Sequence, residues 1–114
     1  MRDASKHRDL FPGALEMMIL QTLRKGPLHG YAIAQQIITA SNESLRVEEG
    51  SLYPALQRML KTGLVEAKWG MSANNRRVRL YTLTKAGTKH LEHEVTRLEH
   101  MLGGITRVLA LARS

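Results

Sequence analysis

The stretch EEGSLYPALQRMLKTGLVEAKW, residues 48–69, decides the fold because it joins a short helix to a strand across one glycine. In its first part the apolar residues recur at helical spacing and fall on one side: Leu52, Leu56, Met59 and Leu60. That side is predicted to face a core. Gly63 stands where helices commonly end in the left-handed conformation, and residues 64–69 then alternate as a strand does.

The opposite side of this helix is sparsely charged. It carries a glycine, a proline and hydrogen-bonding groups, with longer side chains along its edges: Gly50, Pro54, Gln57 and Lys61, then Tyr53 and Arg58 at the edges. A helix that starts at Gly50 or Ser51 tolerates Pro54, because first-turn amides have no partner within the helix. Such a face admits close approach of another molecule.

Two more helices are expected before this one, and both follow from apolar spacing. The first lies between the pair Pro12 and Gly13 and the pair Gly26 and Pro27, and the second covers about residues 30–40. A polar stretch, residues 39–44, ends the second helix and leaves only a tight break before the third.

A second strand is expected at residues 78–83, which alternate in the same way as residues 64–69. The turn-forming residues 70–76 between them predict an antiparallel hairpin with Arg76 and Arg77 near its tip. Residues 67–91 contain six cations and no acid: Lys68, Arg76, Arg77, Arg79, Lys85 and Lys89. A segment of this kind indicates an anionic partner, with a solvated basic face as the alternative.

The last segment, residues 85–112, is expected to form a long helix. Apolar residues recur along it in steps of four and three, which is a heptad seam: Leu91, Val95, Leu98, Leu102, Ile105, Leu109 and Ala112. At 1.5 Å per residue the helix would be about 40 Å long, more than a small core needs. A second copy is the simplest partner for the surplus, which predicts a homodimer. A stripe folded back on its own domain is the alternative.

Composition bounds the class of protein. The chain has 114 residues, room for one modest core, and a net charge of +7. It has no cysteine, which excludes disulfides and thiolate chemistry, and no apolar run approaches the roughly 18 residues of a membrane span. The charged N-terminus is unlike a secretory signal. A cytoplasmic protein without a membrane partner is expected, and the basic charge favours nucleic acid.

Three helices, a hairpin and a long helix follow one another in the order of a winged helix-turn-helix. The predicted fold class is therefore mainly α (α+β), a winged helix-turn-helix with a long C-terminal dimerisation helix. Its expected parts are an N-terminal arm (1–12), a DNA-binding domain (13–84) and the dimerisation helix (85–114). The third helix would enter the major groove of double-stranded DNA, while the hairpin, or wing, lies on the backbone or in the adjacent minor groove.

Four motifs resemble the PadR family of bacterial transcriptional regulators: HGYAIAQQI, VEEGSLYPALQRMLKTGLVEAKWG, NNRR and LYTLTKAG. DLFPG together with SANNRR resembles the acidobacterial-type subgroup. The resemblance covers nearly the whole chain and implies a homodimeric repressor, whose two-fold symmetry predicts an inverted-repeat operator. The residues expected at the DNA are Tyr31, Gly50, Ser51, Tyr53, Pro54, Gln57, Arg58, Lys61, Asn75, Arg76 and Arg77. Those expected in the dimer are Leu91, Val95, Leu98, Leu102, Ile105 and Leu109.

The chain departs from such relatives at positions that bear on specificity. Gln57 and Leu60 stand where relatives often have His and Glu, which puts the base preference in doubt. Relatives with aromatic ligands often use a tryptophan in the C-terminal helix, where this chain has none. The single tryptophan, Trp69, is expected to be a packing residue of the wing. An unidentified small-molecule effector stays open, but a stacked aromatic one is not supported.

Three other functions compete with DNA binding. His90, His93, Glu94 and His100 have spacings that would suit a divalent metal in a metal-sensing regulator, but the histidines fall outside the seam on a face expected to be solvated. No cofactor is predicted. An enzyme is not expected, because the chain has no nucleophile elbow, phosphate loop or evident carboxylate pair. A protein-interaction module, with the last helix docking a partner, is the remaining alternative.

Overall fold

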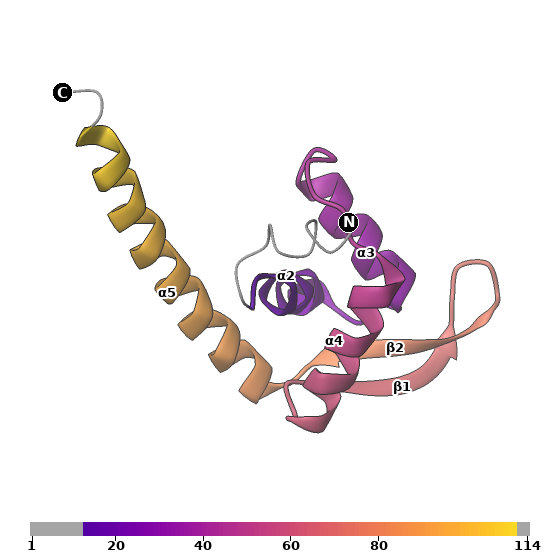
Figure 1. The fold of residues 1–114 in the computed structure, drawn as a ribbon. Helices are drawn as coiled ribbons and strands as arrows, with labels where there is room; N and C mark the ends of the chain where they lie inside the picture. Colours follow the sequence, from indigo (N-terminus) through magenta and orange to yellow (C-terminus); the bar gives the residue numbers. More distant parts are fainter. Residues whose placement is uncertain (1–12, 112–114) are drawn as a thin grey trace.

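The computed structural model describes residues 13–111, and Figure 1 shows its elements in chain order. They are α2 (Ala14–Thr22), the 3-10 helix η1 (Leu23–Lys25), α3 (Gly30–Ala40), α4 (Glu49–Lys61), β1 (Val65–Met71), β2 (Arg77–Leu83) and α5 (Lys85–Ala110). The expected N-terminal arm, residues 1–12, and the last seam position, Ala112, lie outside the described residues. The order confirms the predicted fold class, a winged helix-turn-helix with a long C-terminal helix.

The start of α4 differs from the prediction. The helix begins at Glu49, with Glu48 as its N-cap residue, so Pro54 lies in the helix interior beyond the first turn. Because proline has no amide hydrogen, the carbonyl of Gly50 receives no helical hydrogen bond from position 54. The expectation of a first-turn proline was wrong because it weighed only backbone hydrogen bonding. Burial of the apolar side of α4 against the core stabilises the helix despite this gap.

One core holds the helices and the hairpin together. It contains buried side chains from every helix and from both strands: Ile19, Leu20, Leu23, Ile33, Ala34, Ile37, Leu52, Ala55, Leu56, Met59, Val65, Tyr81 and Leu91. Burying a valine, leucine, isoleucine or methionine side chain contributes roughly 1.5–3 kcal/mol, so the apolar sides of the helices dominate the stability of the domain. The side of α4 that was predicted to face the core does so.

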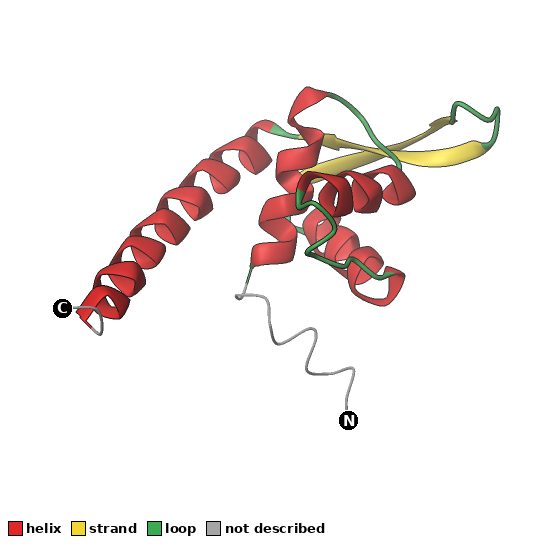
Figure 2. Ribbon diagram, turned by 90° about the horizontal axis from the view of Figure 1, so that it is seen from above, coloured by secondary structure: helices red, strands yellow, loops and turns green. Residues whose placement is uncertain are grey.

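The hairpin is paired in antiparallel register from Val65 opposite Leu83 to Met71 opposite Arg77. Its base packs on the core, and Figure 2 shows its far end reaching beyond the helices. Tyr81 also pairs with Leu28 in the segment before α3, since the Tyr81 amide donates to the Leu28 carbonyl at 2.8 Å. This bridge, which periodicity did not predict, fixes the wing beside the N-terminal end of α3.

Thr84 joins the hairpin to α5. Its Oγ1 accepts a hydrogen bond from the amide of Gly87 at 2.9 Å and caps the helix. The same hydroxyl donates to the carbonyl oxygen of Gly63 at 2.7 Å, next to that of Leu64 at 3.0 Å. A Cβ atom at Gly87 would collide with the Leu64 carbonyl, so only glycine permits this close approach. The start of α5 is therefore fixed to the end of α4 and to the hairpin.

The first half of α5 packs against the core through Leu91 and Val95, and its second half runs away from the domain, on the side opposite the hairpin tip (Figure 1). The Cα radius of gyration is 16.0 Å, compared with about 13 Å for a compact domain of similar length. The projecting half of α5 accounts for the difference. No helix within residues 13–111 is both long and apolar enough to cross a membrane.

Candidate nucleic-acid interface

An open groove of about 870 Å³ lies between the N-terminal end of α3 and the hairpin, with one side chain of α4 in its wall. Four of the residues predicted to bind DNA meet there: Tyr31, Tyr53, Arg76 and Arg77. Arg79 adds a third guanidinium, and none of the described residues that line the groove is a carboxylate. The groove is therefore a positively charged concave surface with aromatic walls, which suits a polyanion with flat bases.

The wall on the α3 side begins with His29. This residue is the N-cap of α3, and its Nδ1 accepts a hydrogen bond from the amide of Ala32 at 3.3 Å. The His29 and Tyr31 rings stack with centroids 6.4 Å apart. Tyr31 is 66% exposed, so its ring is available to a partner in the groove. The cap fixes where α3 begins, and the stacking fixes where Tyr31 lies.

Tyr53 connects α4 to α3 at the position of Gly30. A Cβ atom at Gly30 would lie 2.6 Å from the Tyr53 hydroxyl oxygen, so the phenol occupies the space that glycine leaves open. Burial of the ring raises the pKa of Tyr53, and the negative charge of Glu49 and the neighbouring Tyr81 raise it further. The hydroxyl therefore stays protonated at neutral pH and keeps a hydrogen to donate. With 41% of its surface exposed, Tyr53 still reaches the groove.

The outer face of α4 is open, as expected. Gly50, Pro54, Gln57 and Lys61 are exposed, and Ser51 is half-buried. A Cβ atom at Gly50 would meet nothing within 4 Å, so the backbone itself is accessible there. This face lies beside the groove, because Tyr53 marks the edge at which the two surfaces meet.

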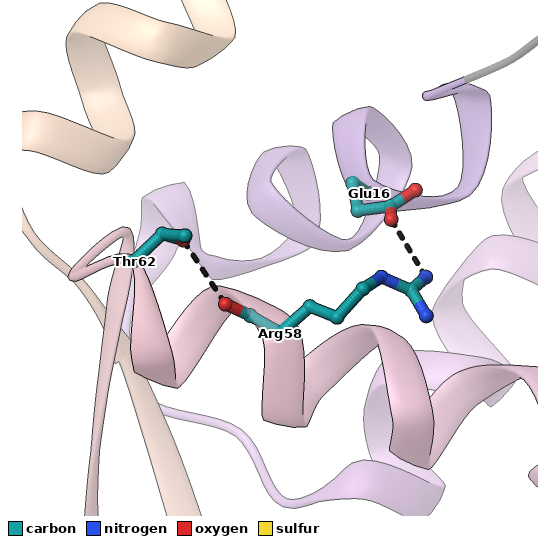
Figure 3. A network of polar contacts seen from close by, with 3 residues as sticks. All are labelled: Glu16, Arg58 and Thr62. Atoms are coloured by element: carbon teal, nitrogen blue, oxygen red, sulfur yellow. Dashed lines mark hydrogen bonds and ion pairs between the residues drawn. The ribbon is translucent and has the colours of Figure 1, made fainter.

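Arg58 is held on the other edge of α4. Its Nη2 donates to Oε2 of Glu16 in α2 at 2.8 Å. Figure 3 shows this pair together with Thr62, whose hydroxyl donates to the Arg58 carbonyl oxygen at 3.0 Å. An exposed ion pair of this kind contributes only about 0–1 kcal/mol to stability, so its main effect is to orient the Arg58 side chain. The Arg58 guanidinium is kept beside α2 and away from the groove.

The tip of the hairpin is a tight turn that presents its basic residues outward. Asn75 has the left-handed φ of 63°, and its amide donates to the Ser72 carbonyl at 2.9 Å. The Ser72 amide donates to the Arg76 carbonyl at 2.8 Å, which closes the loop. Arg76 and Arg77 follow directly and are exposed. The turn thus brings Arg76 and Arg77 to one end of the groove, whereas Asn75 is exposed in the turn itself and does not line the groove.

Trp69 does not have the role expected of it. The prediction of a packing residue is wrong, because the indole is 59% exposed and lines the groove. Its cross-strand partner is Arg79, and both residues were missed as candidates for the interface. Alternation assigns a side chain to a face of its own strand, but only the pairing register shows that Trp69 and Arg79 lie on the same face of the hairpin. His29 was missed as well, although its place before Gly30 suits an N-cap.

The predicted dimer seam divides into two parts. Leu91 is fully buried in the core of its own domain, and Val95 packs against that core, so Leu91 cannot contact a second copy. Leu98 is half-buried, whereas Leu102 and Ile105 are each 41% exposed and Leu109 is 65% exposed. Three further apolar residues widen the exposed part: Met101, Val108 and Leu111. The stripe is thus intramolecular in its first half and uncovered in its second.

The three histidines of α5 are exposed. Within residues 13–111 no three His, Cys, Asp or Glu side chains converge as metal ligands would, so His90, His93, Glu94 and His100 do not form a metal cluster.

Comparisons with known proteins point to one family. Residues 19–93 match the sequence profile of the "Transcriptional regulator PadR-like family". An uncharacterized protein X of Lysinibacillus sphaericus is 30% identical over 87 residues, which span 76% of this chain and 80% of that protein.

Solved structures share the fold. A transcriptional regulator from Clostridium thermocellum matches with a TM-score of 0.78 at 26% identity, covering 87% of this chain and 96% of that one. Bacillus subtilis PadR in complex with operator DNA matches with a TM-score of 0.63 at 26% identity, covering 71% of this chain but only 47% of that one.

Proposed function

The chain belongs to the PadR-like family of transcriptional regulators, and on that premise we propose that it is a homodimeric repressor that binds an inverted-repeat operator in double-stranded DNA. The related PadR of Bacillus subtilis, which has the same fold, binds operator DNA. Members of this family are regulators and not enzymes, and no catalytic activity is assigned to the chain.

The observation that carries the proposal is the basic groove beside the outer face of α4. Three guanidiniums and two exposed tyrosines converge there, and no described lining residue is acidic. The major groove of B-DNA is about 12 Å wide and admits an α-helix. With α4 inserted, the hairpin would lie on the adjacent phosphates, where Arg76 and Arg77 meet the backbone.

The residues of this surface divide into two roles. Ser51, Tyr53 and Gln57 have groups that both donate and accept, so we assign them to base edges, and the bare backbone at Gly50 allows the approach. Tyr31, Lys61, Asn75, Arg76 and Arg77 are assigned to phosphates. Arg58 is set apart from both sets because Glu16 holds its guanidinium.

Selection of bound fragments from random duplex DNA tests the proposal. We expect enrichment of an inverted repeat whose half-sites are centred about 34–36 Å apart, or a multiple of that distance. Affinity should fall steeply between about 50 and 200 mM salt, because phosphate contacts release counterions. Absence of any DNA affinity at about 50 mM salt would rule the function out.

Finer features of the function are also proposals. DLFPG and SANNRR support membership of the acidobacterial-type subgroup, although most of DLFPG lies outside the described residues. A DNA partner supports a cytoplasmic location. Repression would arise because the bound dimer occludes a promoter, and a reporter gene downstream of the selected site should then be silenced. An effector, if present, would lower this silencing when added to the same assay.

A second function is favoured by one observation, the uncovered apolar stripe formed by Leu102, Ile105 and Leu109. In that case α5 would dock a different protein and the winged helix would be a scaffold. Recovery of one defined partner together with no DNA affinity at about 50 mM salt would favour this function over repression.

A further inference from the structure

We propose that Trp69 is a positioning residue of the DNA interface: its indole holds the guanidiniums of Arg77 and Arg79 on the groove wall, where they contact the phosphate backbone. The inference rests on the proposed DNA-binding function. It adds two residues, Trp69 and Arg79, to the interface, and it assigns Arg77 to the groove wall as well as to the hairpin tip.

The geometry places both arginines on one ring. Cζ of Arg77 is 4.5 Å from the Trp69 ring centroid, and Cζ of Arg79 is 5.9 Å from it. Both distances are within the range in which a guanidinium is attracted to the face of tryptophan. Arg79 is directly opposite Trp69 in the strand register, and Arg77 is the diagonal neighbour. Three side chains from two strands thus form one cluster.

The cluster lies on the inner face of the hairpin, the face that packs on the core at its base. Val65 and Tyr81 on this face are buried, whereas Trp69 is 59% exposed farther toward the tip. Alternation keeps all of them on the same side of the sheet. The side that stabilises the domain near the helices therefore becomes a binding wall once the hairpin extends beyond them.

Electrostatics explains why the ring is needed. The two guanidiniums carry like charges on neighbouring positions, and within the described part of the chain neither pairs with a carboxylate: the ion pairs there join Arg58 to Glu16 and Arg97 to Glu94. The electron-rich indole face offsets their repulsion without neutralising them. Both charges are therefore ordered and still available to phosphate, which an acidic partner would not allow.

The opposite face of the hairpin supports the same arrangement. A Cβ atom at Gly70 would lie 2.5 Å from Cδ1 of Leu80, so the Leu80 side chain covers the backbone beside Trp69 on that face. This contact fills the outer side of the strand pair at the level of the cluster. The indole and the arginines are left on the inner face, toward the groove.

The first test compares Trp69→Leu and Trp69→Phe by DNA titration across salt concentrations, with the selected duplex. Trp69→Leu keeps an apolar side chain but removes the ring, so we expect affinity about tenfold lower and a salt slope smaller by about 1–2, one for each phosphate that an arginine no longer neutralises. Trp69→Phe retains a ring face and should recover most of the affinity and the full slope. Met71→Leu, an exposed neighbour on the same face, is the matched control and should behave as wild type.

A double-mutant cycle between Trp69 and Arg79 separates a positioning role of Trp69 from a merely structural one. Arg79→Ala should weaken binding severalfold in the wild-type chain and have little further effect in Trp69→Leu, because the arginine is already displaced. An undiminished Arg79→Ala effect in that background, or wild-type affinity and slope in Trp69→Leu, would overturn the inference. If the wild-type chain fails to bind any DNA, the proposed function itself is wrong.

A second measurement needs no variant. Trp69 is the single tryptophan of the chain, so intrinsic tryptophan fluorescence reports this site alone. Quenching by acrylamide, which is neutral and is not repelled by DNA, should fall severalfold when the duplex is added. If acrylamide quenches the indole equally in the free protein and in a saturated complex, then DNA does not cover the cluster and the inference fails.

Discussion

At position 30 the space for a side chain is taken by the phenol of Tyr53. Gly30→Ala would place a methyl group against the ring, and because Tyr53 is 41% exposed, the ring can move outward. We therefore expect a small change in the free energy of unfolding but a loss of preference for the selected site of about 1–3 kcal/mol. Competition gel shifts against random DNA measure that preference.

The matching variant for this prediction is Tyr53→Ala. It should lose the same preference, and adding Gly30→Ala to it should change nothing further, because the methyl group then has no ring to displace. If Gly30→Ala retains full preference for the selected site, Tyr53 does not read it.

The arginines are expected to contribute unequally to DNA binding. Arg76→Ala and Arg77→Ala each remove a cation from the hairpin, so binding should weaken across all sequences and the salt slope should fall by about 1. Arg58→Ala should leave the slope unchanged and cost about 0–1 kcal/mol of stability, because its guanidinium is paired with Glu16. Salt titrations of the three variants, alongside urea denaturation, distinguish these outcomes. Equal salt slopes for Arg77→Ala and the wild-type chain would show that the hairpin does not contact the DNA.

Individual side chains were predicted with mixed success, and the reason is physical. The outer face of α4 follows from 100° steps along one helix, so its exposure at Gly50 and Gln57 was predictable. The direction of Arg58 depends on Glu16, 42 residues away, and the exposure of Trp69 depends on how far the hairpin extends. Neither is contained in local spacing.

The apolar spacing of the sequence correctly predicted which helices and strands of residues 13–111 exist. α3 covers the residues expected of it, and both strands extend the predicted runs toward the turn. The start of α4 was predicted too late because only the backbone hydrogen bond lost at Pro54 was considered. The core contacts of Leu52, Leu56 and Met59, which stabilise the longer helix, were left out. The bridge between Leu28 and Tyr81 was missed because a single paired residue has no periodicity.

The hydroxyl of Thr84 holds the joint between the hairpin and α5. Thr84→Ala removes the cap on Gly87 and the hydrogen bond to Gly63, so it should lower the free energy of unfolding by about 1–2 kcal/mol. Thr84→Ser keeps the hydroxyl and should restore most of the stability. Urea denaturation followed by far-ultraviolet circular dichroism makes the comparison. Equal stability of the alanine and serine variants would show that the hydroxyl contributes nothing at the joint.

The molecule as a whole leaves one apolar surface uncovered. The second half of α5 projects from the domain with its apolar side uncovered, and a second copy would bury it. A parallel or antiparallel pairing of these helices would set the distance between two α4 faces. That distance is what an inverted repeat in DNA would match.

Dimerisation can be tested apart from DNA. Leu102→Asp or Leu109→Asp puts a charge on the uncovered stripe and should yield single chains at micromolar concentration, with much weaker DNA binding. His100→Asp adds the same charge at an exposed position outside the seam and should remain a dimer. Sedimentation equilibrium reports the mass of each. A wild-type chain that sediments as a monomer would contradict the role proposed for α5.

The proposed function requires above all a dimer that binds duplex DNA through α4 and the hairpin. Sedimentation velocity of a labelled, selected duplex titrated with protein at about 50 mM salt measures both features together. We predict saturation at two chains per inverted-repeat duplex, with the boundary returning to that of free DNA as salt is raised. A duplex that sediments as free DNA at every protein concentration, or saturates with one chain, would contradict this function.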